Sequence, residues 1–146
     1  SLVMDTYSFG YSSSGFTDMP MNHKVFLAQF DAIKKLASEG PCVMVGRCAD
    51  YALSEYKDCF SVFVHADTDW RINRLSQKHN KTAKEAKDMI NKTDKSRSSY
   101  YNYYTNKKWG AASSYNLCVD SSKLGIDGAA KAIIQAIEIF DSIKNK

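Results

Sequence analysis

Three short apolar runs separated by helical segments constrain the fold of this chain more than any other feature. They lack polar alternation, which is typical of strands buried on both faces. The runs are Cys42–Val45, Phe60–Val64 and Leu117–Val119. Strands joined by helical crossovers form parallel sheets with right-handed connections. The sequence therefore predicts an α/β fold built on a parallel sheet.

Apolar spacing predicts a helix before the first of these runs and another after the last. In residues 22–38 an apolar residue recurs every three or four positions, and Gly40-Pro41 supplies a stop. After the last run we expect a loop over residues 120–127 and then a closing helix. Its inward residues are predicted to be Ala130, Ile133, Ile134, Ile137 and Phe140.

Capping residues predict two further helices in the middle of the chain. Asp67 or Thr68 caps a helix that runs to about His79. The sequence Thr82-Ala83-Lys84-Glu85 is a capping-box pattern and opens a longer helix. This second helix runs into residues 93–110, where cations and aromatic rings are concentrated.

Length and composition favour one domain. A chain of 146 residues with 44% apolar and 25% charged residues has ordinary globular values. We divide the domain into an irregular segment over 1–21 and a helix with two core strands over 22–66. Lid-like helices follow over 67–110, and the last strand and closing helix occupy 111–146.

The distribution of charge and the pattern of cysteines indicate the kind of binding partner and the cellular compartment. The net charge of +4 is mild, and its cations crowd between Arg71 and Lys108, which indicates a local anionic partner. The cysteines form no C-x-x-C pair and no secretory leader precedes them, which predicts a reduced, cytoplasmic setting. The histidines lack metal-ligand spacing, and no apolar run reaches the length of a membrane span. We therefore expect neither a metal site nor a membrane span.

Polar residues follow each predicted strand, where parallel sheets bind ligands. The first strand is followed by Arg47 and Asp50, the second by Arg71 and Arg74, and the third by Ser121. Arginine offers a two-pronged donor for phosphate. An isolated arginine is nevertheless more often part of a salt bridge or of solvated surface.

The cationic aromatic stretch has two interpretations. Its cations Lys92, Lys95 and Arg97 have no nearby run of acidic partners and look available for an external anion. Cations among aromatic rings suit single-stranded nucleic acid, because phosphates are neutralised and bases stack. They equally suit a lid that closes over a small nucleotide. The tyrosines are equally explained as packing in an amphipathic core or interface.

Several of these residues form motifs by which the chain resembles the cytidylate kinase-like family, from about Tyr7 onward. The motifs are Val45–Tyr51, Asp94–Tyr104, Lys108-Trp109-Gly110 and Tyr115–Gly125. The resemblance implies a P-loop fold of the nucleoside monophosphate kinase type, which is a three-layer parallel sheet with helices on both faces. It also implies transfer of the γ-phosphate of ATP, with Mg²⁺, to CMP or a similar monophosphate.

The resemblance also implies roles for individual residues. Catalytic contacts to the transferring phosphoryl group fall to Lys92, Lys95 and Arg97. Substrate-binding roles fall to Arg47, Asp50 and Asp94, and ATP-binding roles to Arg71, Arg74 and Ser121. Cys48 stands where true cytidylate kinases carry an aspartate, so within that motif only Arg47 carries over cleanly.

One element of the family pattern does not occur in the sequence. No G-x-x-x-x-G-K-[ST] is present, so the resemblance places a P-loop strand and helix upstream of Ser1. The chain alone is then expected to be inactive, with acceptor-site and lid parts only. A sheet of three strands would also be thin, which predicts an exposed edge or a covering partner such as a second copy.

Two alternatives to the kinase interpretation remain open. One is a nucleotide-binding module without catalysis, which the missing P-loop and Cys48 favour. The other is a binder of single-stranded nucleic acid. The sequence favours a nucleotide pocket, because its cations are spread over three loops that converge at one end of a sheet.

Overall fold

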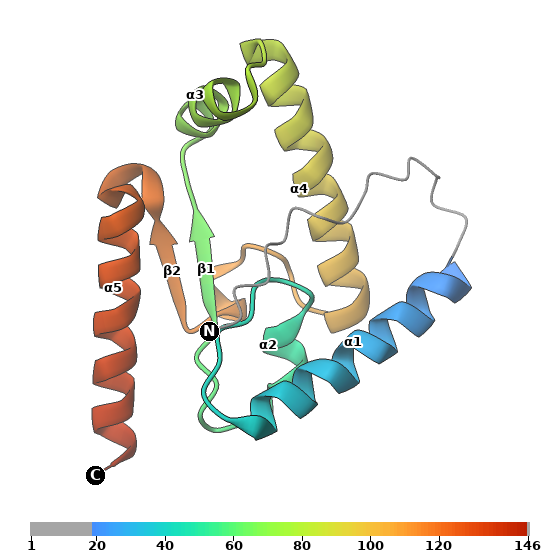
Figure 1. Ribbon diagram of the computed structural model, residues 1–146, viewed down its shortest axis with the longest axis vertical. Helices are drawn as coiled ribbons and strands as arrows, with labels where there is room; N and C mark the ends of the chain where they lie inside the picture. Colours follow the sequence, from blue (N-terminus) through green and yellow to red (C-terminus); the bar gives the residue numbers. More distant parts are fainter. Residues whose placement is uncertain (1–18, 146) are drawn as a thin grey trace. The chain divides into compact units, whose positions relative to one another are not determined.

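The computed structural model describes residues 19–145 (Figure 1). The chain divides into two compact units between Cys59 and Phe60. An irregular segment was predicted over 1–21, and residues 1–18 of it lie outside the described residues. Residues 19–21 correct that prediction, because they already belong to helix α1, Met19–Glu39. Pro20 is compatible with this start, since the first turn of a helix needs no backbone donor.

The first unit is built from α1 and the short helix α2, Ala49–Ala52. Its core consists of Ile33, Ala49, Ala52 and Leu53, with Phe30 and Ala37 packed against them. The helical spacing that predicted α1 is thereby confirmed, because one of its faces is the buried one. The helix ends before Gly40, whose φ of 149° lies outside the helical range.

The strand predicted over Cys42–Val45 is wrong. These residues have no strand structure, and Val43 and Val45 are 88% and 65% exposed. Only Met44 between them packs against the core of the first unit. A strand is held by hydrogen bonds to a neighbouring strand, and within the described residues none pairs with this segment. Apolar character alone therefore did not produce a strand.

The second unit contains a small parallel sheet and has α/β architecture. Strand β1, Val62–His65, pairs in parallel with β2, Leu117–Asp120, so that Phe63 lies opposite Cys118 and His65 opposite Asp120. Helix α5, Ser121–Lys144, packs against both strands and runs beside β2 in Figure 1. Both strands were predicted close to these positions.

The loop predicted over residues 120–127 is largely helical. Asp120 caps α5 by accepting a hydrogen bond from the amide of Ser122, so the helix begins at Ser121 and is interrupted at Gly125. The inward face was predicted only in part, since Ile133 and Phe140 are half-buried as expected. Ala129 is buried, whereas Ile134 and Ile137 are exposed. The two-stranded sheet covers only one stripe of this helix.

Helices α3, Thr68–His79, and α4, Ala83–Thr105, form a hairpin in the second unit. The side chain of Asp67 accepts hydrogen bonds from the first turn of α3. Thr82 and Glu85 form a complete capping box at the start of α4, as the sequence predicts. No helix in the described part of the chain is long and apolar enough to cross a membrane.

An aromatic cluster joins the far end of α4 to β1. The ring of Phe63 contacts those of Trp109 and Tyr115, with centroids 5.2 and 4.9 Å apart, and Tyr115 stacks on buried Tyr101. The turn before 3-10 helix η1, Ala112–Ser114, needs glycine at position 110, where φ is 74°. A Cβ there would lie 3.2 Å from the ring of Phe63.

Candidate functional site

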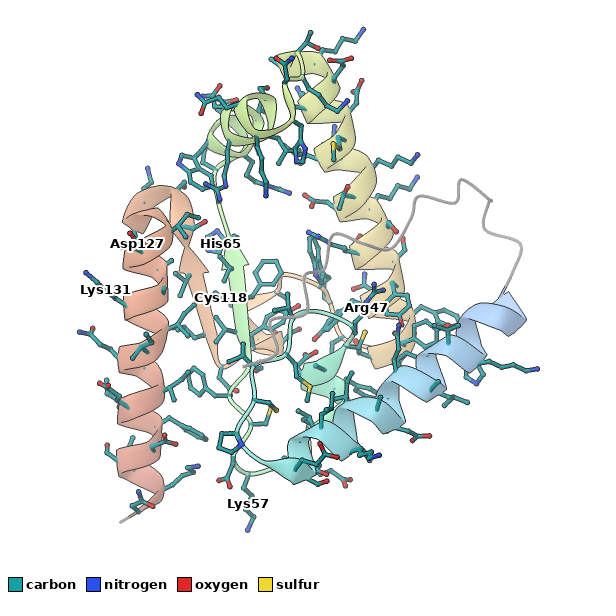
Figure 2. The ribbon with its side chains drawn as sticks, viewed as in Figure 1. Arg47, Lys57, His65, Cys118, Asp127 and Lys131 are labelled. Atoms are coloured by element: carbon teal, nitrogen blue, oxygen red, sulfur yellow. The ribbon has the colours of Figure 1, made fainter. Side chains whose placement is uncertain are left out.

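The carboxyl ends of β1 and β2 are tied together by hydrogen bonds. The hydroxyl of Ser121 donates to the carbonyl of His65 at 3.1 Å, and the amide of Asp67 donates to the hydroxyl of Ser122 at 3.1 Å. Figure 2 shows His65 at this end of β1. Ser121 is only 5% exposed, so its side chain fixes the strand ends and faces little solvent.

The two carboxylates at these strand ends serve as helix caps. Asp67 accepts from the amide of Asp69 at the start of α3, and Asp120 accepts from Ser122 at the start of α5. Hydrogen bonding from Ser122 is the main cause that lowers the pKa of Asp120. Among the described residues, no group of three or more His, Cys, Asp and Glu side chains could hold a metal ion.

Arg71 lies in the first turn of α3, the helix that follows β1, and forms a two-pronged ion pair with Asp94 of α4. Its Nη1 is 2.7 Å from Oδ2, and its Nη2 is 2.8 Å from Oδ1. The side chains are 30% and 26% exposed. The hydrogen bond to Asp94 is the main cause that raises the pKa of Arg71. This contact joins the two helices of the hairpin.

A second arginine lies one turn further along α3. The guanidinium carbon of Arg74 is 5.5 Å from the centre of the Trp70 ring, a cation–π arrangement. Arg74 also lines a shallow depression with Gln77 and Lys78. This part of α3 therefore presents positive charge beside an aromatic surface.

The predicted catalytic cations lie within two turns of α4. Lys92, Lys95 and Arg97 are all exposed to solvent. The tyrosines that follow have mixed environments: Tyr101 is buried in the aromatic cluster, while Tyr103 is 60% exposed and contacts Tyr104 edge-on. The packing role predicted for the tyrosines therefore describes Tyr101 better than Tyr103.

Arg47 and Asp50 belong to the first unit and are described by themselves. Arg47 and Cys48 both have a φ of 56°, and this turn leads into α2 (Figure 2). The side chain of Arg47 is exposed, whereas that of Cys48 is buried. Burial, with a smaller contribution from the charge of Asp50, raises the pKa of Cys48 to about 11. The thiol is therefore neutral at physiological pH.

The structure brings together two residues for which the sequence predicted separate roles. Arg71, predicted to bind ATP, is paired with Asp94, predicted to bind the acceptor. No sequence signal reveals this pair, because its members are 23 residues apart on different helices. The hydrogen bonds that join the ends of β1 and β2 were also not predicted from the sequence. The serines and aspartates that follow both strands were their only sequence signal.

Comparison with known proteins gives a family and a structural neighbour. The sequence profile of the cytidylate kinase-like family matches residues 1–123. An uncharacterized protein from Eubacterium ventriosum, known from its crystal structure, is 33% identical and superposes with a TM-score of 0.77. That match covers 80% of this chain and 74% of the other. No curated protein matches the sequence.

Proposed function

Because the chain belongs to the cytidylate kinase-like family, we propose that it forms the acceptor and lid parts of a nucleoside monophosphate kinase. The reaction would transfer the γ-phosphate of ATP to CMP or a similar monophosphate. Family membership supports a kinase-like function in general. The particular nucleotides, and the three-layer P-loop fold expected for such enzymes, are parts of the proposal.

The observation that carries the proposal is the cationic α3–α4 hairpin beyond β1. Ligands of parallel sheets bind outside the carboxyl ends of the strands, and Arg71 lies in the first turn of α3, the helix that follows β1. Lys92, Lys95 and Arg97 add exposed charge on the second helix. Phosphoryl transfer depends mainly on positive charge placed around the phosphate oxygens, which is what these side chains offer.

The proposal gives the basic residues of this chain distinct tasks. Arg71 and Arg74 would bind the phosphates of ATP, while Lys92, Lys95 and Arg97 would contact the transferring group. Arg47, with Asp50, would hold the acceptor monophosphate. Ser121 is better placed to fix the strand ends than to touch a ligand, because its hydroxyl is bonded to His65.

ATP and Mg²⁺ fit this chain to different degrees. The exposed cations suit a polyphosphate. Mg²⁺ keeps several waters and binds mainly to substrate phosphates with one or two carboxylates, so it would arrive with the nucleotide. The sequence contains no G-x-x-x-x-G-K-[ST], so the proposal assigns no donor-phosphate loop to these 146 residues.

Thermal melts of this chain test the proposal. We would compare CMP, other monophosphates, ATP and a short single-stranded RNA, each at low and high salt. A ligand that binds the native state raises the melting temperature by mass action. We expect a shift with a monophosphate that persists in high salt. If no mononucleotide shifts the transition, the proposal of a nucleotide site in this chain is wrong.

The same melts separate two other functions. A nucleotide-binding module without catalysis is favoured by Cys48, whose neutral thiol cannot supply the charge of a carboxylate. It predicts mononucleotide binding but no phosphoryl transfer even when a donor-phosphate loop is supplied. A single-stranded nucleic-acid binder would respond to RNA alone and lose that response in high salt, because contacts to many phosphates release counterions.

A further inference from the structure

Asp94 is the only acidic residue among residues 89–119. The same stretch carries the basic side chains Lys92, Lys95, Arg97, Lys107 and Lys108. The carboxylate of Asp94 nevertheless pairs with Arg71, which lies on the other helix of the hairpin. An acidic side chain in such basic surroundings reduces the positive charge offered to an external anion.

The geometry of the pair resembles the binding of a phosphate. Two guanidinium nitrogens of Arg71 meet the two oxygens of Asp94 at 2.7 and 2.8 Å. Arginine binds phosphate through the same kind of parallel, two-pronged contact. The carboxylate therefore occupies the edge of Arg71 that a phosphate group would use.

Because the Arg71–Asp94 pair is partly buried, replacing Asp94 by a phosphate costs less free energy than opening the pair without a new acceptor. Arg71 and Asp94 are 30% and 26% exposed, so opening the pair leaves a partly desolvated guanidinium without its acceptor. An incoming phosphate would satisfy the same donors. Solvent exposure at this level also leaves a route by which a ligand reaches the pair.

We propose that Asp94 is an internal competitor for a phosphate group at Arg71, and that ligand phosphate releases the contact holding α3 to α4. The identification of the ligand as a nucleotide rests on the proposed function, whereas the exchange itself concerns any polyphosphate. Asp94 then regulates the site and does not bind the substrate. Removing its charge strengthens phosphate binding.

Calorimetric titration with inorganic tripolyphosphate tests this competition. Asp94→Asn removes the charge with little change in size, and we expect roughly tenfold tighter binding than in the unchanged protein. Asp88→Asn removes the same charge from an exposed position of the same helix. It controls for the general change in net charge and should change affinity much less. Equal gains in both variants would overturn the proposal.

A second set of variants tests whether the gain acts through Arg71. In the double variant Arg71→Gln with Asp94→Asn, we expect the gain of the single Asp94 variant to be lost. Weaker binding in Asp94→Asn would instead mean that Asp94 contacts the ligand. A lower melting temperature without tighter binding would make the pair structural only. Either result contradicts the competition.

Hydrogen exchange in the unchanged protein tests the same competition without any variant, so the result does not depend on whether the variants fold. Tripolyphosphate should increase amide exchange in α3 if it breaks the contact with α4. Decreased exchange in α3, or no binding of tripolyphosphate by any form, would overturn the exchange of partners. Failure of the kinase proposal would give a different pattern of results. Tripolyphosphate would still compete with Asp94, while CMP and ATP would cause no specific response.

Discussion

Cys48 shows how one residue changes the chemistry of a motif. It follows Arg47 in a left-handed turn and is buried at the start of α2. Its neighbour Asp50 adds to the effect of burial, and together they raise the pKa of Cys48 to about 11. Where a carboxylate would be charged, this side chain is neutral, so only Arg47 contributes charge at these two positions.

Thiol labelling checks the state of Cys48. The thiolate is the reactive form, and a pKa of about 11 leaves about one thiolate in a thousand at pH 8. We expect iodoacetamide to modify exposed Cys42 at least about tenfold faster than Cys48 in the folded protein. In urea the two rates should become similar. Similar rates in the folded protein would show that Cys48 is accessible and ionised.

The raised pKa of Cys48 also predicts how stability depends on pH. The folded state keeps the proton between the ordinary value of 9.0 and about 11, while the unfolded state loses it. The contribution of Cys48 to stability is therefore present below pH 9.0 and is lost as the pH rises toward 11. Urea melts of the Cys48→Ala variant should show a weaker decline over this range. An unchanged decline would rule out Cys48 as its source.

At position 110, both the backbone conformation and the packing favour glycine. Its φ of 74° disfavours other residues, and a Cβ would lie 3.2 Å from Phe63. We expect Gly110→Ala to lower the free energy of unfolding by about 1–3 kcal/mol. Gly46→Ala is the control, because Gly46 has a similar φ of 71° but open space around it. If denaturant melts show equal losses, the contact with Phe63 contributes nothing.

At the scale of elements, the sequence predicted the helix caps and the parallel pair β1–β2 correctly, whereas the strand over Cys42–Val45 was not found. The caps Asp67 and Thr82 bond to amides within three residues, so their pattern is visible in the chain itself. Cys42–Val45 had the composition of a strand but no strand partner among the described residues. The face of α5 that packs depends on the sheet, and periodicity alone placed the exposed Ile134 and Ile137 inward together with the half-buried Ile133 and Phe140.

In the candidate site, too, contacts between residues distant in the sequence could not be predicted. The sequence marked Arg71, Asp94 and the α4 cations as residues of interest. It could not show that Arg71 and Asp94 contact each other, because that contact depends on how α3 packs against α4. Nor could it show that Ser121 is held by a bond to the backbone of β1. Roles that depend on distant contacts required the structure.

The capping box of α4 predicts an acid-sensitive helix start. Hydrogen bonds from the backbone and hydroxyl of Thr82 lower the pKa of Glu85 below its ordinary 4.5. The resulting stabilisation is present above pH 4.5 and is lost as the pH falls through the lowered value. Glu85→Gln should therefore have its largest effect on melting near neutral pH and little effect in acid. A pH-independent effect would contradict the role of the charge.

At the scale of the whole molecule, the second unit carries the small sheet and the cationic hairpin, and the first carries Arg47. The single domain predicted over 1–146 stays a prediction. So does a second copy of the chain against the sheet, whose outer edges have no strand partner among the described residues. The central claim is narrower, namely that the cations of α4 bind a nucleotide phosphate.

Calorimetric titration of ATP into the unchanged protein, Arg97→Ala and Lys84→Ala tests that claim most directly. Lys84 is an exposed cation in the first turn of the same helix, away from the proposed phosphate contacts. At physiological ionic strength, we expect Arg97→Ala to weaken binding roughly tenfold or more, with little change in melting temperature. Lys84→Ala should bind nearly as the unchanged protein does. Equal losses in both variants, or no loss in Arg97→Ala, would contradict the account.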